Sequence, residues 1–277
     1  IWSREEEVTQ GAYRPQSSAH LTAAIGKDGK IAAWRNDYAQ TEGIEGEATF
    51  IYDLPAVSRR LFKHESNQTT GAWRSVNSTQ HGFYNECFMD ELAAAAGADP
   101  VEFRARHLKP GSRHLAVLNE VAKRSGWGTP LPAGVGRGVA IVESFQTIVG
   151  QVIEASVKDD GTPKIHKVYA VVDCGRTVNP SNGENQIQGG IVMGLSTAVG
   201  EAITLEKGAV VQSNFGDYPI LKMEGAPASI DVHFLESGAP MGGLGEPGVP
   251  PSAPALANAL FAATGKRIRS LPIVAIS

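Results

Sequence analysis

The spacing of hydrophobic residues changes along the chain. Up to residue 126 apolar residues recur mainly at helical spacing, whereas beyond residue 138 they form the continuous or alternating runs that are typical of strands. The first half predicts a hairpin at 19–40 and helices at 79–96, 99–108 and 112–126. The second half predicts strands at 137–145, 150–161, 163–175 and 228–237, a helix at 179–200, and a final helix that Ser252 caps and Gly265 ends.

Glycine, proline and polar residues mark where these elements end. Gly97 stands where a C-terminal glycine cap belongs, and Asp99 followed by Pro100 is typical of a helix start. A loop is expected at 41–50 and a short amphipathic segment at 54–64.

The segment 126–138 has five glycines and two prolines, so it is the best linker candidate. We therefore expect an α+β chain of two mixed α/β domains, at 1–128 and 136–277.

The predicted helix at 179–200 contains three glycines that disfavour a helix. Gly189, Gly190 and Gly194 each weaken intrinsic helicity by roughly 1 kcal/mol. We therefore expect another segment to pack closely against this surface.

Composition excludes several classes of function. Net charge is −4 over 277 residues, which gives no electrostatic footprint for nucleic acid or an anionic membrane surface. No apolar run approaches the length of a membrane span. Cys87 and Cys174 can form one disulfide at most, and the histidines do not cluster at ligand spacing, so we expect no metal held by protein ligands. The compartment stays open.

A single carboxylate, Glu246, stands in a run of glycines and prolines directly before the last helix. Pro247 biases Glu246 towards an extended backbone, and the glycines at 242, 243, 245 and 248 permit tight folding or close approach to a ligand. The residues alone allow two interpretations, a rigidly held functional acid or a solvated acid in a surface turn.

Two further segments are candidates with equally plain alternatives. Gln186 and Gln188, followed by glycines, suit a polar cofactor, or they are exposed glutamines beside a helix-packing face. Arg74, next to Trp73 and before a helix, can bind a phosphate through its forked donors, or it is a surface arginine in a cation–π or ion-pair contact.

These segments occur in the order found in a known family. The chain resembles the C-terminal part of the molybdopterin-binding subunit of xanthine oxidase-family molybdenum hydroxylases, of the isoquinoline 1-oxidoreductase β-subunit type. The resemblance covers roughly residues 71–272 and rests on "GAWRSVNSTQHGFYNECFMDELAAAAGADPVEFRARHL", "VVDCGRTVNPSNGENQIQGGIVMGLS" and "GGLGEPGVPPSAPALANALFAATG". They match the family's Phe-Arg segment, its Asp-x-Gly…Asn-Pro…Gln…Gly-Gly block and its Gly-Glu-Pro motif.

The resemblance implies a role for each matched residue. Glu246 matches the active-site glutamate, the base that takes a proton from an oxygen ligand of molybdenum. Arg74 matches the arginine of the Phe-Arg motif beside the substrate and cofactor pocket, and Trp73 replaces the usual phenylalanine. Ser75 and Val76 stand where many relatives have Gly-Phe, which puts family-typical substrates in doubt. The residues matched to cofactor contacts are Gln186, Gly189, Gly190 and Gly245.

The resemblance also implies cofactors and partners. Molybdenum would be held by the sulfur atoms of a molybdopterin, of the cytosine dinucleotide form, which bacterial relatives favour. The [2Fe–2S] clusters would lie on a separate iron–sulfur subunit, since two cysteines cannot supply four ligands. The family's Gly-Gln-Gly segment has no match here, so we expect a second molybdopterin-binding chain or a missing N-terminal portion to complete the pocket.

The expected reaction is the oxidation of an aldehyde or N-heteroaromatic compound with oxygen from water. Two alternatives stay open. The chain could be a catalytically silent scaffold that assembles without binding pterin, or an unrelated glycine-rich binding module for a polar ligand.

Overall fold

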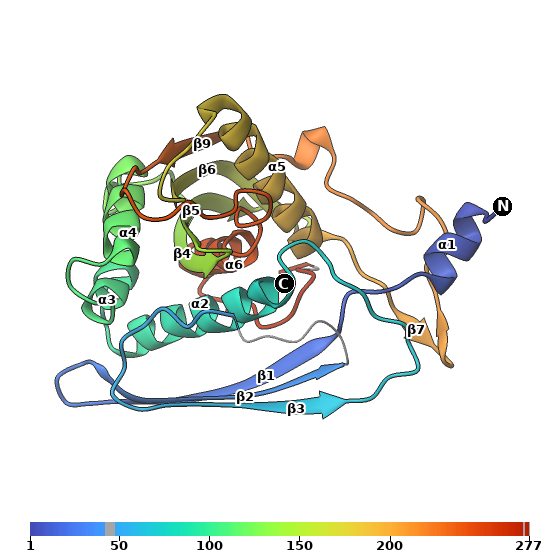
Figure 1. Cartoon of the computed structure of the whole chain (residues 1–277), viewed down its shortest axis with the longest axis horizontal. Coiled ribbons are helices and arrows are strands. Elements are labelled where there is room, and N and C mark those ends of the chain that lie inside the picture. The colour runs from blue at the N-terminus through green and yellow to red at the C-terminus, as the bar shows by residue number, and fades with distance from the viewer. Residues whose placement is uncertain (42–47, 274, 277) are drawn as a thin grey trace.

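The chain folds around two β-sheets with helices between and around them (Figure 1). The structure is a computed structural model that describes residues 1–41, 48–273, 275 and 276. The α+β fold class predicted from the sequence is confirmed. Residues 42–47 of the loop expected at 41–50 lie outside the described residues.

The first sheet lies below the helices in Figure 1 and has the order β1–β2–β3. β1 (Ser17–Ile25) and β2 (Ile31–Thr41) pair antiparallel, as the predicted hairpin requires. β3 (Val57–His64) pairs parallel with β2 and forms an edge. Nearly all its residues are exposed, so the interpretation of 54–64 as an amphipathic segment is wrong.

Three helices follow and cover the space between the sheets. α2 (Asn77–Ala95) contacts β1, β4 and α6, and Gly97 adopts a left-handed φ of +61° just beyond its end. The Asp99 carboxylate accepts hydrogen bonds from the first backbone N–H groups of α3 (Pro100–Arg106), as predicted. α4 (Arg113–Arg124) packs on the second sheet through Val117 and Val121.

The second sheet has the order β4–β5–β6–β9 and is buried on both faces. Its strands are β4 (Gly136–Ser144), β5 (Thr147–Val157), β6 (Pro163–Asp173) and β9 (Ser229–Phe234). Alternate residues of β5 point to opposite cores: Val152 joins the one beneath α4, and Ile153 joins the one with α5 and α6. Both faces are covered, which explains the near-continuous apolar runs in these strands.

α5 (Pro180–Val199) and α6 (Ser252–Thr264) lie on the same side of the second sheet. Glycine lets α6 approach β4, because a Cβ atom at Gly138 would stand 2.1 Å from the backbone nitrogen of Ala259. The predicted linker at 126–138 ends inside a strand, because β4 begins at Gly136. Both hydrophobic clusters draw residues from either side of it, and the division into domains at 1–128 and 136–277 stays a prediction.

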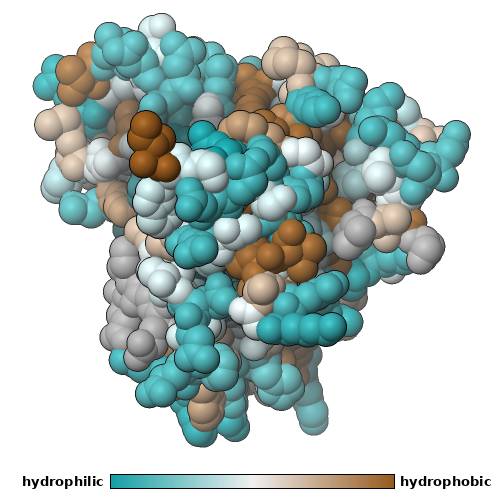
Figure 2. Space-filling model, turned by 90° about the vertical axis from the view of Figure 1, so that its right-hand side faces the viewer, coloured by the Kyte–Doolittle hydropathy of each residue, from teal (hydrophilic) through white to brown (hydrophobic). Residues whose placement is uncertain are grey.

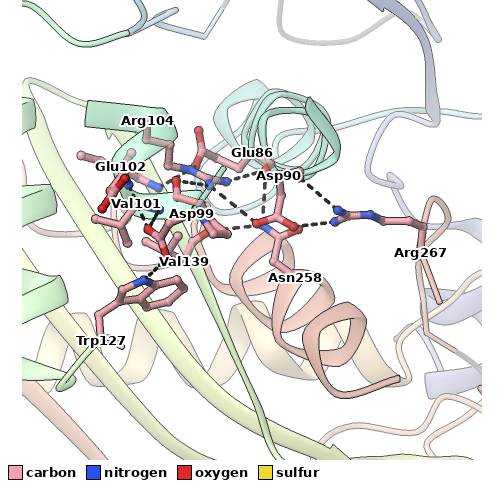
Figure 3. Close-up of polar contacts among 12 residues, drawn as sticks. Glu86, Asp90, Asp99, Val101, Glu102, Arg104, Trp127, Val139, Asn258 and Arg267 are labelled. Atoms are coloured by element: carbon pink, nitrogen blue, oxygen red, sulfur yellow. Dashed lines mark hydrogen bonds and ion pairs between the residues drawn. The ribbon is translucent and has the colours of Figure 1, made fainter. Parts of the chain in front are cut away.

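A buried ion network joins α2, α3, β4 and α6 (Figure 3). The guanidinium of Arg104 is fully buried and donates from Nε to Glu86 Oε2 at 2.8 Å and from Nη2 to the Glu86 carbonyl at 2.7 Å. The other Glu86 oxygen accepts from the Tyr52 hydroxyl. Arg267, beyond α6, pairs with Asp90 on α2. The network ties four distant segments together.

Several elements differ from the sequence-based expectations. α1 (Arg4–Gln10) and the short strands β7 (Leu205–Glu206) and β8 (Ala209–Val210) were not predicted. The pattern Ser3-x-x-Glu6 forms a capping box, a readable signal for α1. Ser252 does not cap α6 as expected, because Pro251 holds the cap position and the Ser252 hydroxyl bonds elsewhere. A 3₁₀ turn, Met223–Gly225, precedes β9.

Candidate active site

The loop that carries Glu246 is hydrogen-bonded, on the N-terminal side of Glu246, to the turn between β4 and β5. The backbone nitrogen of Gly243 donates to the Phe145 carbonyl at 2.9 Å, and the Thr147 hydroxyl donates to the Gly243 carbonyl at 2.7 Å. A Cβ atom at Gly242 would stand 2.6 Å from the Gln146 carbonyl oxygen, so this contact requires glycine. The loop therefore lies directly on the hairpin turn.

On the C-terminal side of Glu246, the loop is held by buried hydrogen bonds and close packing at Gly248. The buried Gln151 side chain on β5 donates to the Gly248 carbonyl at 2.8 Å, and the Ser252 hydroxyl lies 3.1 Å from the same oxygen. A Cβ atom at Gly248 would approach the Ile187 carbonyl oxygen of α5 to 2.7 Å. On α5, a Cβ atom at Gly194 would meet the Val249 carbonyl oxygen at 2.8 Å. The close packing expected at the α5 glycines is found at Gly194 and Gly190, but not at Gly189.

The backbone just before Glu246 is held by two other predicted residues. Arg74 donates to the Gly245 carbonyl from Nε at 3.0 Å and from Nη2 at 2.6 Å. The Gln186 amide on α5 donates to the same oxygen at 2.8 Å. Gln186 and Arg74 lie 59 and 171 positions before Gly245 in the chain, yet both bind its carbonyl oxygen.

Ser75 holds the next carbonyl. Its hydroxyl donates to the Glu246 carbonyl at 2.6 Å, and the Val249 backbone nitrogen donates to that oxygen at 3.0 Å. Ser75 is fully buried and has a φ of +73°, and Val76 has a φ of +40°. Left-handed backbone costs a non-glycine residue about 1–3 kcal/mol. Glycine would therefore suit the position of Ser75 better than serine does.

The Glu246 side chain contrasts with its clamped backbone. The residue is half-buried, and its carboxylate makes no hydrogen bond or ion pair with any residue of the described ranges. The backbone of Glu246 is held in place, but its carboxylate has no internal partner. The carboxylate is therefore available to accept a proton or a hydrogen bond from a bound molecule.

The other predicted site residues take different places. Gly190 packs on Gly248, at 3.3 Å from an added Cβ atom to its Cα, and so belongs to the helix-packing face. A Cβ atom at Gly189 or Gly245 would meet no described atom within 4 Å. Trp73 lines a large cavity whose lining includes none of Arg74, Gln186, Gly245 and Glu246.

The Asp-x-Gly motif has a role that the sequence did not reveal. Asp173, at the end of β6, is buried and accepts hydrogen bonds from Arg113 of α4 at 2.8 and 2.9 Å and from the Ser237 hydroxyl at 2.7 Å. Burial alone would raise the pKa of Asp173, but these hydrogen bonds and the Gly175 backbone N–H outweigh it and lower the pKa. The acid fixes the start of α4 to the strand end beside the loop.

Comparison with known proteins places the chain in a family. Two family models, each described as a molybdopterin cofactor-binding domain, match residues 1–108 and 139–227. The beta chain of isoquinoline 1-oxidoreductase from Brevundimonas diminuta is 31% identical over 99% of the chain. The chain belongs to the molybdopterin-binding region of the xanthine oxidase family of molybdenum hydroxylases. The loop that carries Glu246 lies beyond the matched range 139–227.

Other members of the family extend the comparison. A nicotinate dehydrogenase subunit of Pseudomonas putida is 36% identical over 73% of the chain. The chain spans 38% of the length of the isoquinoline relative and 18% of the nicotinate relative.

Solved structures of the family share the fold. Quinoline 2-oxidoreductase of Pseudomonas putida 86 superposes with a TM-score of 0.85 at 14% identity, covering 99% of this chain and 63% of that one. Aldehyde oxidoreductase of Desulfovibrio gigas gives a TM-score of 0.79 at 15% identity, covering 99% of this chain and 50% of that one.

The residues around Glu246 fit a molybdopterin that approaches from outside the chain. Gly189 and Gly245 leave open space above their backbone, and the Gln186 side chain and the Glu246 carboxylate are not enclosed. The surrounding groups are the Arg74 guanidinium, the Gln186 amide and backbone, which suit a polar ring that carries its own metal ligands. Within the described ranges no three His, Cys, Asp or Glu side chains gather at metal-binding distance. Both cysteines are buried and unpaired, and no helix in the described part of the chain could span a bilayer.

Proposed function

We propose that the chain contributes one side of the molybdenum-cofactor pocket of an oxidoreductase and supplies Glu246 as its general base. The enzyme would oxidise an aldehyde or an N-heteroaromatic compound with water as the source of oxygen. The observation that carries the proposal is the double clamp on consecutive carbonyls around Glu246, which leaves the carboxylate itself without a partner among the described residues.

The clamp serves the chemistry of a base. A general base must lie within about 2.6–3.2 Å of the proton that it takes, so a drifting backbone would misplace it. Arg74 and Gln186 hold the Gly245 carbonyl, and Ser75 holds that of Glu246. Each of these is a positioning residue, since each contacts backbone. Glu246 then holds or releases a proton at its carboxylate oxygens.

Gln186, Gly189 and Gly245 are the residues that would hold the cofactor from this side. The Gln186 amide can hydrogen-bond to a pterin without adding charge, and the absence of a side chain at Gly189 and Gly245 lets the ring approach closely. When bound, the cofactor supplies the redox chemistry, with molybdenum as the electron acceptor. Its cytosine dinucleotide form, a second chain or segment that closes the pocket, and an iron–sulfur subunit that takes the electrons onward are parts of the same proposal. The isoquinoline and nicotinate relatives are, by their names, themselves subunits.

The decisive experiment replaces Glu246 by glutamine in the protein purified with all chains that accompany it. Glu246→Gln keeps the size of the side chain but removes the basic oxygen. We expect kcat with isoquinoline or benzaldehyde, whichever is turned over, to fall at least about 10²–10⁴-fold while molybdenum content stays unchanged. The matched control is Glu236→Gln, an exposed acid beyond β9, which should keep full activity.

Two results would reject the proposal in different ways. If Glu246→Gln stays within a few-fold of the unaltered enzyme, the base assignment is wrong. If the unaltered assembly contains no molybdenum and has no visible absorption spectrum, the chain is instead the catalytically silent scaffold.

A further inference from the structure

The large cavity that Trp73 lines lies away from the Glu246 loop, on the side of the molecule that carries α1 and β7. It has a volume of about 830 Å³ and lies between α1, the ends of β1 and β2, and the segment that follows α5. Figure 2 shows this side of the molecule, where hydrophobic residues lie in separate patches among hydrophilic ones. The volume falls within the range of about 300–1,000 Å³ that is usual for small-molecule sites.

One cation on the cavity wall, Arg14, has no anionic partner within the part of the chain that the structure describes. Its guanidinium carbon lies 4.6 Å from the centre of the Trp73 ring, so the flat group stacks on the indole. Across the described residues Arg14 makes no hydrogen bond and no ion pair. Burial lowers the pKa of Arg14 to about 10, which leaves it charged at neutral pH. A half-buried charge without a partner is costly, and arginines so placed are usually paired.

The acids on the same wall are engaged elsewhere. Glu201 accepts a hydrogen bond from the Tyr218 hydroxyl at 3.1 Å, and Glu7 pairs with Arg4 in α1. Glu201 is near enough to raise the pKa of Arg14, but it forms no ion pair with it. The stacked guanidinium therefore keeps its N–H donors for a group that enters the cavity.

We propose that this cavity binds a small organic anion, a carboxylate or phosphate on an aromatic or apolar body, with its charge held by Arg14. A guanidinium presents paired donors that match both oxygens of a carboxylate or phosphate. The body of the ligand would lie against Tyr13, Tyr218 and Pro272, which supply apolar wall. The site does not depend on the role proposed for Glu246, since neither Glu246 nor Arg74 lines the cavity.

The test titrates the purified protein, with any chains that accompany it, with four probes in low-salt buffer. Benzoate and phenyl phosphate carry both features, benzamide lacks the charge, and inorganic phosphate lacks the apolar body. Calorimetry and tryptophan fluorescence report binding. We expect benzoate or phenyl phosphate to bind at least about tenfold more tightly than benzamide and than inorganic phosphate. Which of the two binds more tightly distinguishes a carboxylate from a phosphate ligand.

Variants then assign the charge to Arg14. Arg14→Gln should weaken the binding of the preferred anion at least about tenfold, and Arg14→Lys should fall between, because lysine keeps the charge but lacks the planar fork. The matched control is Arg35→Gln, an exposed arginine on β2 that pairs with Asp37 and does not line the cavity. It should leave binding unchanged.

Several outcomes would overturn the proposal. Benzoate and phenyl phosphate that bind no better than benzamide exclude an anion site, and this comparison needs no variant, so it stands even if Arg14→Gln fails to fold. Equal binding to Arg14→Gln assigns the charge to another residue. Binding to the isolated chain that disappears in the larger assembly shows that another polypeptide fills the cavity.

Discussion

The buried network around Arg104 and the loop around Glu246 both join segments that lie far apart in the chain, yet they leave their charged groups in opposite conditions. In the network, Glu86 uses both carboxylate oxygens and its carbonyl within the protein, and the Arg104 guanidinium is fully enclosed. In the loop, side chains bind backbone carbonyls and the Glu246 carboxylate is left without a partner among the described residues.

The difference separates structural from functional polar groups. Buried polar groups that are fully satisfied hold elements in register and have nothing left to offer a ligand. A side chain whose backbone is held in place but whose charged group has no partner can still bind a ligand. By the same criterion Arg14 belongs with Glu246, whereas Arg104, Asp90 and Asp173 belong with the framework.

The largest expected effect comes from breaking the network. Arg104→Met would leave the Glu86 and Asp90 carboxylates buried without their cation, and we expect the free energy of unfolding to fall by about 3–5 kcal/mol. Urea denaturation measures it. Arg106→Gln, which removes an exposed pair with Glu102 on the same helix, should change stability by less than about 0.5 kcal/mol. Equal losses in the two variants would show that the buried network stabilises the fold no more than an exposed ion pair does.

A smaller effect is expected where α5 supports the loop. Gly194→Ala would place a methyl group 2.8 Å from the Val249 carbonyl oxygen, so we expect a loss of about 1–3 kcal/mol despite the better helix propensity of alanine. Gly189→Ala on the same helix has open space and should gain up to about 1 kcal/mol. Thermal unfolding of the two variants compares them directly, and a stabilised Gly194→Ala would show that the loop yields easily.

The smallest effect tests the clamp itself at Ser75. Ser75→Ala removes the hydrogen bond to the Glu246 carbonyl and keeps the left-handed backbone, so we expect a loss of about 1 kcal/mol. Ser75→Gly loses the same bond but relieves the backbone, and it should be more stable than the alanine variant by about 1 kcal/mol. Equilibrium unfolding ranks the pair. An alanine variant as stable as the glycine variant would contradict the strain assigned to this position.

Much of the fold could be predicted from the sequence because local signals agree with the tertiary structure. Asp99 caps α3 as expected, Gly97 adopts the left-handed conformation that a helix end needs, and the apolar runs of β4 to β6 form a sheet that is buried on both faces. Ser252 looked like a cap for the same local reason. The wrong assignment arose because its hydroxyl is drawn to Gln151 and Gly248, a contact that no local pattern encodes.

The candidate site could be predicted only in part. Its residues were identified from motifs, but what they do to one another depends on bonds from side chains to backbone carbonyls. Arg74 and Gln186 come from distant parts of the chain and both bind the Gly245 carbonyl. Every residue has a carbonyl oxygen, so the sequence does not indicate which one these side chains bind. The catalytic and cofactor-binding roles of all these site residues, including those of Glu246, Trp73, Val76 and Gly190, stay predictions. Arg14 was missed because a single arginine near the start of the chain becomes notable only when its lack of a partner is seen.

The edge strand β3 has a practical consequence for handling the protein. Val57, Leu61 and Phe62 are exposed along a strand whose outer backbone edge is unpaired within the described sheet, which favours pairing with another copy. The same strand carries Arg59, Arg60, Lys63 and His64, and like charges on two copies oppose that pairing. Added salt shortens the distance over which such repulsion acts, to about 8–10 Å at 0.1–0.15 M and to about 3 Å at 1 M, so self-association in concentrated solution should grow with ionic strength. Low-salt buffers should therefore limit self-association through this edge.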